Sequence, residues 1–322
     1  MPLFKPTGKL HIPTTLLRDK YLVPPFSILD SSVNAWLQRR NMWEQVIKNR
    51  SENIRNVSII KHNTPYLNAM DYDEGYKGLE RNGYTSTFDP FLCEILVKWF
   101  SRIGDTVFDP FAGGHVRGAV SAMTGRDYVG VDINPIQVKA NDEAWASIIK
   151  AYDTKEFGKP CWIVADSTSI DLNVDYEKYN LMLTCPPYYN LEVYTDNPKD
   201  LSTYKTYDEF LEQYKQAVRN CYTALEDDSF AVIVVEEIRD KWGILYGFVP
   251  DTIQAFKDAG FQYYNELILE NRIMSLGVRC PKYFEQSRKI GRHHQNVLVF
   301  FKGDTKHIEQ KFGKFTEGKD LI

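Results

Sequence analysis

The sequence predicts an α/β fold: a doubly wound, mostly parallel, seven-stranded sheet with helices on both faces and an antiparallel edge strand, the Rossmann-like arrangement. From Phe88 onward, short apolar runs rich in β-branched residues alternate with helical segments. Uninterrupted apolar strands separated by helices are typical of a parallel sheet that is covered on both sides. The last two expected strands have no helix between them, so we expect them to form an antiparallel pair at the edge.

Residues 1–84 differ from the rest and are expected to be an N-terminal extension that packs on the core or assists recognition. They contain Pro24-Pro25, many Asn and Arg residues, and one amphipathic pattern at residues 35–49. At helical spacing, the apolar residues of that pattern line one face. They are Trp36, Leu37, Trp43 and Ile47.

Residues 85–303 are expected to form the core domain. Strands are expected at residues 105–108, 128–133, 162–165, 181–184, 230–235, 263–269 and 296–301. Helices are expected at residues 91–100, 117–123, 135–150, 207–225 and 250–259. Residues 304–322 are charged and contain glycine, which predicts a loosely held C-terminal tail.

The composition excludes several classes of protein. With 322 residues, 43% hydrophobic and 25% charged, the chain is neither disordered, nor collagen-like, nor a disulfide miniprotein. A formal net charge of −4 argues against coating nucleic acid through charge alone, although a local basic patch remains compatible with it.

The cysteines predict neither a disulfide framework nor a metal site. There are five of them, an odd number, and no two stand in a CxxC pair, so reduced thiols in the cytoplasm are the expectation. The N-terminal residues lack the apolar core of a signal peptide, and no apolar run is long enough to span a bilayer. We expect no membrane partner; the sequence does not indicate the oligomeric state.

Three carboxylates are expected at the ends of three consecutive strands. Asp109 opens the segment Asp109-Pro110-Phe111-Ala112-Gly113-Gly114, Asp132 ends the next strand, and Asp166 the third. Small residues before a helix let the backbone approach a ligand closely. An acid at the end of the second strand can accept hydrogen bonds from the hydroxyls of a ribose. The pattern therefore favours a nucleoside cofactor, whereas helix capping alone remains the alternative. His115 stands where a GxGxxG pattern would need glycine, which argues against a nicotinamide or flavin cofactor.

A second motif follows the fourth expected strand. Cys185-Pro186-Pro187-Tyr188-Tyr189 combines two prolines, which lack N–H donors and leave carbonyls free to accept, with an aromatic ring that can stack on a base. By itself this motif favours a rigid turn with a packed tyrosine over a site. Its place at a strand end beside the expected cofactor favours the site.

Together these motifs resemble those of the amino-methyltransferases of DNA, which methylate adenine N6 or cytosine N4 with S-adenosylmethionine. The matching segments are Asp109–Gly114, Cys185–Tyr188, and Phe88-Asp89-Pro90-Phe91 before an apolar helix. The resemblance covers residues 86–302 and is nearest to phage-encoded DNA methylases, which would work in the cytoplasm of a bacterial host. It implies a Rossmann-like methyltransferase fold, S-adenosylmethionine as cofactor, and DNA as partner, with the target base flipped out. Whether a restriction enzyme accompanies it is not visible in the sequence.

The resemblance also implies roles for individual residues. Cofactor contacts are expected from Phe88, Asp109, Pro110, Phe111, Ala112, Gly113, Asp132, Ile133 and Asp166. The base is expected to be held and activated by Cys185, Pro186, Pro187 and Tyr188. No metal ion is expected.

Two residues depart from the family pattern. His115 replaces the last glycine of the cofactor loop, and Cys185 replaces the usual Asp, Asn or Ser. A thiol is a weak acceptor, but Cys185 is nearly isosteric with serine, which favours cytosine N4 over adenine N6. The alternatives are a cytosine-C5 enzyme with Cys185 as nucleophile, an RNA methyltransferase, and an inactive nucleic-acid-binding protein of the same fold.

The segment 271–295 is expected to be a basic loop that contacts the substrate. It has six basic residues and one acid, a local charge of +5, with aromatic residues between them. Such a composition suits phosphate contacts with base stacking. Substrate contacts are expected from Tyr189, Arg272, Arg279, Lys282, Arg288 and Arg292.

Overall fold

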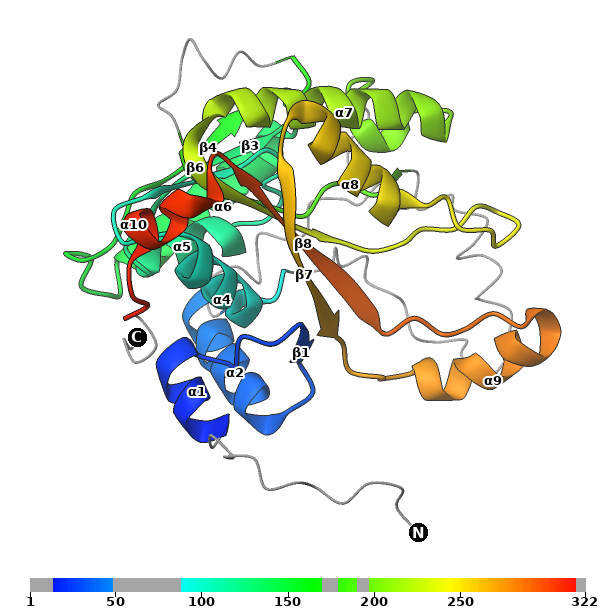
Figure 1. Ribbon diagram of the computed structural model, residues 1–322, viewed down its shortest axis with the longest axis horizontal. Coiled ribbons are helices and arrows are strands. Elements are labelled where there is room, and N and C mark those ends of the chain that lie inside the picture. The colour runs from blue at the N-terminus through cyan, green and yellow to red at the C-terminus, as the bar shows by residue number, and fades with distance from the viewer. Residues whose placement is uncertain (1–13, 49–87, 170–178, 190–196, 317–322) are drawn as a thin grey trace.

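The computed structural model describes residues 14–48, 88–169, 179–189 and 197–316. Its centre is an eight-stranded sheet in the order β1-β7-β8-β6-β5-β2-β3-β4, and helices lie on both sides of it (Figure 1). The strands are β1 (Ile28–Asp30), β2 (Thr106–Asp109), β3 (Asp127–Asp132), β4 (Pro160–Val164), β5 (Tyr179–Thr184), β6 (Leu225–Val235), β7 (Gln262–Glu270) and β8 (His294–Lys302). All seven predicted strands are present, and the doubly wound α/β class is confirmed.

The sheet differs from the prediction in its strand number and in the place of the reversed strand. β8 pairs antiparallel with both β6 and β7, so it lies inside the sheet instead of at its edge. Outside β7, Ile28–Asp30 of the N-terminal region adds an eighth strand in parallel. Three residues are too few for an alternating pattern to reveal a strand, which explains why the sequence did not predict it.

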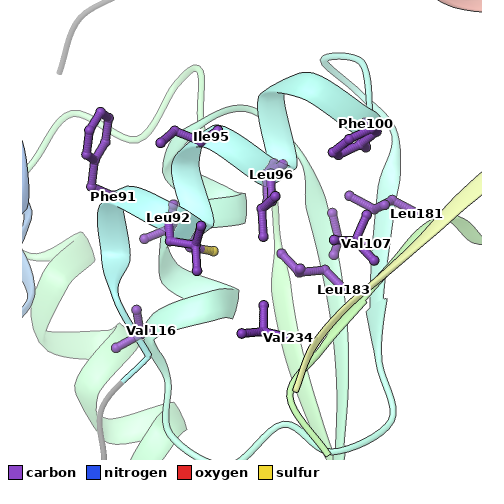
Figure 2. Packing of buried hydrophobic residues seen from close by; sticks show 14 of the residues in the cluster. Phe91, Leu92, Ile95, Leu96, Phe100, Val107, Val116, Leu181, Leu183 and Val234 are labelled. Carbon is purple, nitrogen blue, oxygen red and sulfur yellow. The ribbon is translucent and has the colours of Figure 1, made fainter. Parts of the chain in front are cut away.

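One face of the sheet is covered by α2 (Asn34–Lys48), α4 (Pro90–Phe100), α5 (Val116–Met123) and α6 (Pro135–Ile149). In β6, Phe230, Val232 and Val234 point to this face, as the two-residue period of a strand requires. Figure 2 shows Leu96 and Phe100 of α4 directed at β2 and β5. Helix α4 begins where it does because Asp89 accepts hydrogen bonds from the N–H groups of Phe91 and Leu92, with a proline between.

The other face is covered by α7 (Tyr207–Ala224) and α8 (Phe248–Ala259), against which the alternate residues of β6 and β8 pack. A capping box of Thr206 and Glu209 starts α7, and Glu237 accepts hydrogen bonds from the first N–H groups of α8. The remaining helices are α1 (Thr14–Tyr21), α9 (Leu276–Ser287), α10 (Ile308–Phe312) and the short turns η3 (Leu201–Thr203) and η4 (Thr305–His307).

The C-terminal segment is more firmly attached than the predicted loose tail. Helix α10 places the ring of Phe312 5.2 Å from that of Phe230, and Lys311 donates hydrogen bonds to Asp227 and Ser229. Residues 304–316 therefore pack against one end of the sheet, and residues 317–322 lie outside the described part.

Candidate functional site

The carboxyl ends of β2 and β5 meet at the point where the strand order reverses. From β2 the chain proceeds outward to β3 and β4, and then returns to β5 on the other side of β2. In open α/β sheets, ligands bind in the crevice at such a reversal. The Asp109–Gly114 loop follows β2 and the Cys185–Tyr189 segment follows β5, so both predicted motifs border this point.

Asp109 lies completely buried and is surrounded by donors of the protein itself. Thr184 Oγ1 donates to Oδ1 over 2.7 Å, Tyr128 Oη donates to Oδ2 over 2.9 Å, and the Phe111 N–H donates to Oδ1 over 3.1 Å. Arg117 forms an ion pair with Oδ2. With its oxygens engaged in this way, Asp109 ties the two loops together instead of facing a ligand.

Arg117 of α5 holds the backbone of the Asp109–Gly114 loop. Its Nη2 donates to the carbonyls of Phe111 (2.7 Å) and Ala112 (3.0 Å), while its guanidinium carbon lies 4.9 Å from the centre of the Phe88 ring. Burial by itself would lower the pKa of Arg117, but Asp109 together with Tyr128 and Cys185 outweighs it and raises the pKa. Sequence reasoning missed Arg117, Tyr128 and Thr184; a charged side chain inside an otherwise apolar helix was the available signal.

Asp132 at the end of β3 is attached to the same loop. Its carboxylate accepts the N–H of Gly113 over 2.9 Å and that of Asn134 over 2.8 Å. Burial raises its pKa to about 6, against the effect of these two hydrogen bonds. Gly113 has a φ of +51°, and no atom lies within 4 Å of where a Cβ would be, so there is open space above this backbone.

The other predicted cofactor residues have different environments. Pro110 and Ala112 are buried, whereas Phe88, Phe111 and Ile133 are half-buried. Both carboxylate oxygens of Asp166 are engaged locally: Oδ1 accepts from Thr168 N and Oγ1, and Oδ2 accepts from Ser169 Oγ over 2.9 Å. This turn-forming arrangement matches the capping alternative for Asp166 better than a free cofactor acceptor.

The Cys185–Tyr188 segment continues directly from β5. Cys185, Pro187 and Tyr188 are half-buried and Pro186 is buried. The Cys185 thiol lies within electrostatic range of both Arg117 and Tyr214. The ring of Tyr188 meets Phe248 edge to face, with 6.0 Å between the ring centres, so the start of α8 determines the orientation of this tyrosine.

Tyr189, predicted to contact the substrate, lies in an aromatic cluster and is only 4% exposed. Its ring centre is 5.6 to 5.8 Å from those of Tyr207, Phe210 and Tyr246, and its hydroxyl donates to the Lys205 carbonyl over 2.8 Å. Its position supports the wall of the site instead of offering a contact surface. The sequence after Tyr189 is aromatic and acidic, a composition that suits the wall of a base pocket or a lid, but residues 190–196, with Tyr194 and Asp196, lie outside the described part of the chain.

The basic segment 271–295 is not wholly a loop, because it contains helix α9 (Leu276–Ser287), which Figure 1 shows projecting away from the body of the molecule. Arg272, Arg279, Lys282 and Arg288 are exposed. Arg292 is half-buried, lies 3.1 Å from His294 Nε2, and is close enough to Glu236 to oppose the rise that burial causes in the pKa of Glu236. Arg292 therefore packs where β8 begins and β6 ends, whereas the other four face solvent.

This segment emerges from the same end of the sheet as the two motifs. Thr184 pairs with Ile233, and Ile233 pairs with Leu298, so β8 is two strands away from the end of β5. At the usual strand spacing that separation is about 10 Å. The basic segment begins at the carboxyl end of β7 and returns to the start of β8, on the side of the sheet where the Cys185 loop lies.

Other features of the described residues bear on the predicted chemistry. All five cysteines are free. Within the described ranges, no group of three or more His, Cys, Asp or Glu side chains is placed to hold a metal ion, and no helix is long and apolar enough to cross a membrane. His115 is buried at the N-terminal boundary of α5, directly after the cofactor loop.

Comparison with known families bears out the resemblance to DNA amino-methyltransferases. Residues 29–143 match the family model described as DNA methylase. The match begins at β1, well upstream of residue 86, and includes the Asp109–Gly114 loop; it ends before the Cys185–Tyr188 segment. No sequence among curated proteins matches significantly.

Solved structures resemble this chain only at low sequence identity and low TM-score. A TehB-like SAM-dependent methyltransferase from Corynebacterium glutamicum is 16% identical, with a TM-score of 0.39 over 65% of this chain and 86% of that one. The magnesium protoporphyrin IX methyltransferase of Synechocystis, solved with bound SAM, is 12% identical, with a TM-score of 0.42 over 74% and 96%. A candidate DNA modification methylase from Thermus thermophilus is 17% identical, with a TM-score of 0.33 over 44% and 51%.

Proposed function

Because residues 29–143 match the DNA methylase family, we propose that this chain transfers a methyl group from S-adenosylmethionine to an exocyclic amino group of a base in DNA. The observation that carries the proposal is the junction of two loops at the strand reversal. The Asp109–Gly114 loop lies inside the matched segment, and the hydrogen bond from Thr184 to Asp109 joins it to the loop that begins with Cys185. A methyl donor on one loop and a base on the other would then lie side by side.

The residues around the first loop fit S-adenosylmethionine, the cofactor of this family. The space above Gly113 admits a ligand close to the backbone. Each Asp132 oxygen accepts one backbone N–H and has a further lone pair for a ribose hydroxyl. Asp109 and Arg117 hold the loop in shape without contacting the cofactor. The bound cofactor supplies an electrophilic methyl group on its sulfonium sulfur.

The second loop can hold the amine that receives the methyl group. An exocyclic amine is a poor nucleophile because its lone pair is delocalised into the ring. An acceptor at each N–H would orient the nitrogen as it becomes tetrahedral, and the Pro186 carbonyl can serve as one. The Cys185 sulfur is a weaker acceptor on the other side. Tyr188, held against Phe248, would stack on the base.

We further propose cytosine N4 as the target atom in preference to adenine N6, because Cys185 is close in size to serine. The test is mass spectrometry of nucleosides from unmethylated DNA exposed to the protein and the cofactor, with RNA treated in parallel. N4-methylcytosine is the expected product. Detection of N6-methyladenine instead would change the assigned target base but leave the proposed reaction unchanged. If calorimetry shows tight cofactor binding but neither nucleic acid gains a methyl group, the chain binds without catalysis and the proposal fails.

The role of Cys185 separates this reaction from methylation at cytosine C5. A C5 enzyme needs the thiolate as a covalent nucleophile, whereas here the sulfur only accepts a hydrogen bond. The variant C185S should therefore keep most of the activity, and C185A should lose more of it. Loss of all activity in C185S, together with covalent trapping on a 5-fluorocytosine oligonucleotide, would establish the C5 route instead.

A further inference from the structure

A short turn after β6 presents large apolar side chains to solvent. In this turn (residues 239–245, the Trp242 turn), Trp242 is 75% exposed and Ile244 is 65% exposed. Two other tryptophans of the described chain, Trp36 and Trp43, are almost fully buried. A large apolar side chain held in water at a loop tip is the kind of exception that marks a contact surface.

The Trp242 turn is built rigidly. Asp240 Oδ1 accepts the N–H of Trp242 over 2.9 Å and that of Ile244 over 2.8 Å, and the Asp240 N–H donates to the Ile244 carbonyl. The Arg239 side chain donates a hydrogen bond to the Gly243 carbonyl over 2.7 Å, and the backbone of Arg239 forms an antiparallel β-bridge with that of Leu245. The turn therefore holds Trp242 in place at little further entropic cost on binding.

The base of this turn adjoins the loop proposed to hold the target base. Tyr246 stacks on Tyr207 with 4.6 Å between ring centres and meets Tyr189 edge to face at 5.6 Å. Tyr189 is the residue after Tyr188. In addition, β6 pairs with β5, so the segments that follow these two strands start side by side.

Positive charge surrounds the exposed tip. Arg239 and Lys241 lie in the turn, and the Lys241 Nζ is 5.2 Å from the Trp242 ring centre. The side chain of Lys289, from the basic segment, packs against Gly243 of the turn. A Cβ added to Gly243 would clash with the Lys289 Nζ. The one acid of the turn, Asp240, is engaged by its own backbone. An apolar tip with basic neighbours complements stacked bases between phosphates.

We propose that Trp242 is a wedge that enters the duplex beside the target base and keeps that base out of the stack. The inference rests on the proposed function, in which a base inside a duplex must leave it to reach the methyl donor. Side chains inserted between base steps unstack them in this way in other DNA-binding proteins. Single-stranded DNA has no duplex to open and should not need the wedge.

The test compares tritiated-methyl transfer to whole-genome-amplified DNA, as duplex and as heat-denatured strands. For W242A, the ratio of duplex to single-strand rates should fall about tenfold, because opening one base pair costs a few kcal/mol. W242F, which keeps an aromatic ring, should recover most of the loss. I103A is the matched control: Ile103 is 66% exposed but precedes β2, at the amino end of the parallel strands, opposite the end where the Trp242 turn lies.

The possible outcomes distinguish the wedge from the proposed function. An unchanged ratio in W242A, or equal loss on both substrates with the fold intact by circular dichroism, would overturn the wedge. So would a wild-type protein that methylates only single strands, although the proposed function would survive. A wild-type protein that methylates neither substrate despite binding the cofactor would remove the proposed function and the wedge with it.

Discussion

Asp109 illustrates how a motif residue can act on a ligand site without facing the ligand. The sequence presents it as an acid at a strand end, the position at which many α/β proteins contact a nucleoside. Its carboxylate instead receives donors from Arg117, Tyr128, Thr184 and the backbone. These contacts join β2, β3, β5 and α5 beneath the loop, so the residue stabilises the site from inside.

The ion pair between Arg117 and Asp109 gives a first prediction. R117M leaves a buried carboxylate without its cation and should lower the free energy of unfolding by about 3–5 kcal/mol in urea denaturation. D109N removes the charge but keeps an acceptor for Thr184 and a donor for Tyr128. The double variant should therefore be more stable than R117M alone. If the two losses simply add, the pair is not coupled and this account is wrong.

Asp132 gives a second prediction, which depends on pH. Its pKa of about 6 means that it is ionised above that pH and protonated below it. If the ionised carboxylate accepts ribose hydroxyls, cofactor affinity should fall as the pH drops through about 6. D132N should bind more weakly and lose this pH dependence, as measured by calorimetry. The exposed neighbour D142N on α6 is the control and should keep the wild-type profile.

The same pKa has a consequence for stability. Because it is raised above the ordinary aspartate value, the folded protein favours the protonated form, and the contribution of Asp132 to stability is lost as the pH rises through about 6. D132N has no titrating group at this position, so the unfolding temperature of the wild type relative to that of D132N should fall as the pH rises from about 4 to about 7. A difference that does not change with pH would show that burial does not raise the pKa of Asp132.

At the scale of elements, the sequence predicted the seven long strands because each is an apolar run between turn signals. It did not predict β1 or α9. β1 has three residues, and its pairing with β7 depends on a contact between segments more than two hundred residues apart. α9 has no buried residue, so no core contact favours a helix there, and it contains Pro281, which in a sequence predicts a break in a helix.

The site was predictable to the extent that it lies at strand ends. The sequence predicted that both motifs and Asp132 stand at the ends of strands, as they do in the structure, since strand ends and loop composition are visible in one dimension. It could not show that Asp109 is enclosed by donors from three other elements or that Tyr189 is buried. Both depend on packing between segments distant in sequence, which residue types and spacing do not encode.

Helix α2 gives the prediction at this scale, because it is attached to α4 through polar contacts as well as apolar ones. The Glu94 side chain is fully buried; it accepts two hydrogen bonds from Arg39 and one from Trp43 Nε1 at 2.7 Å. Burial alone would raise the pKa of Glu94, but Arg39 and Lys98 overcome it and lower the pKa. Since α4 starts at the Phe88–Phe91 segment, α2 supports one side of the proposed cofactor site.

R39M should therefore lower the free energy of unfolding by about 2–4 kcal/mol, with Lys98 and Trp43 compensating part of the loss. It should also speed hydrogen exchange in α2. R40M is the matched control on the same helix: Arg40 is 39% exposed and pairs with Glu44 over 3.0 Å and with Asp89 over 3.9 Å, so its loss should cost less than about 1 kcal/mol. Equal effects of the two variants would show that the buried pair does not hold α2.

For the whole molecule, charge is segregated and not uniform. The net charge is −4, yet the segment 271–295 carries +5, which leaves −9 on the rest of the chain. This segment and the Trp242 turn lie at the end of the sheet where the two loops meet, and Lys289 connects them. Positive charge concentrated at this end would attract the DNA backbone there and orient the duplex toward the Cys185 loop.

The last prediction tests that orientation through salt dependence. If Arg279, Lys282 and Arg288 each neutralise one phosphate, the triple glutamine variant should reduce the slope of log affinity against log salt by about 2.7. Fluorescence anisotropy of a labelled duplex over a salt series measures it. The control replaces Lys155, Lys159 and Lys257 by glutamine; all three are exposed and precede the amino ends of β4 and β7, at the opposite end of the sheet. Because both variants change the net charge equally, only a local contact predicts a difference between them. An equal reduction would mean that DNA responds to overall charge and that α9 does not bind it.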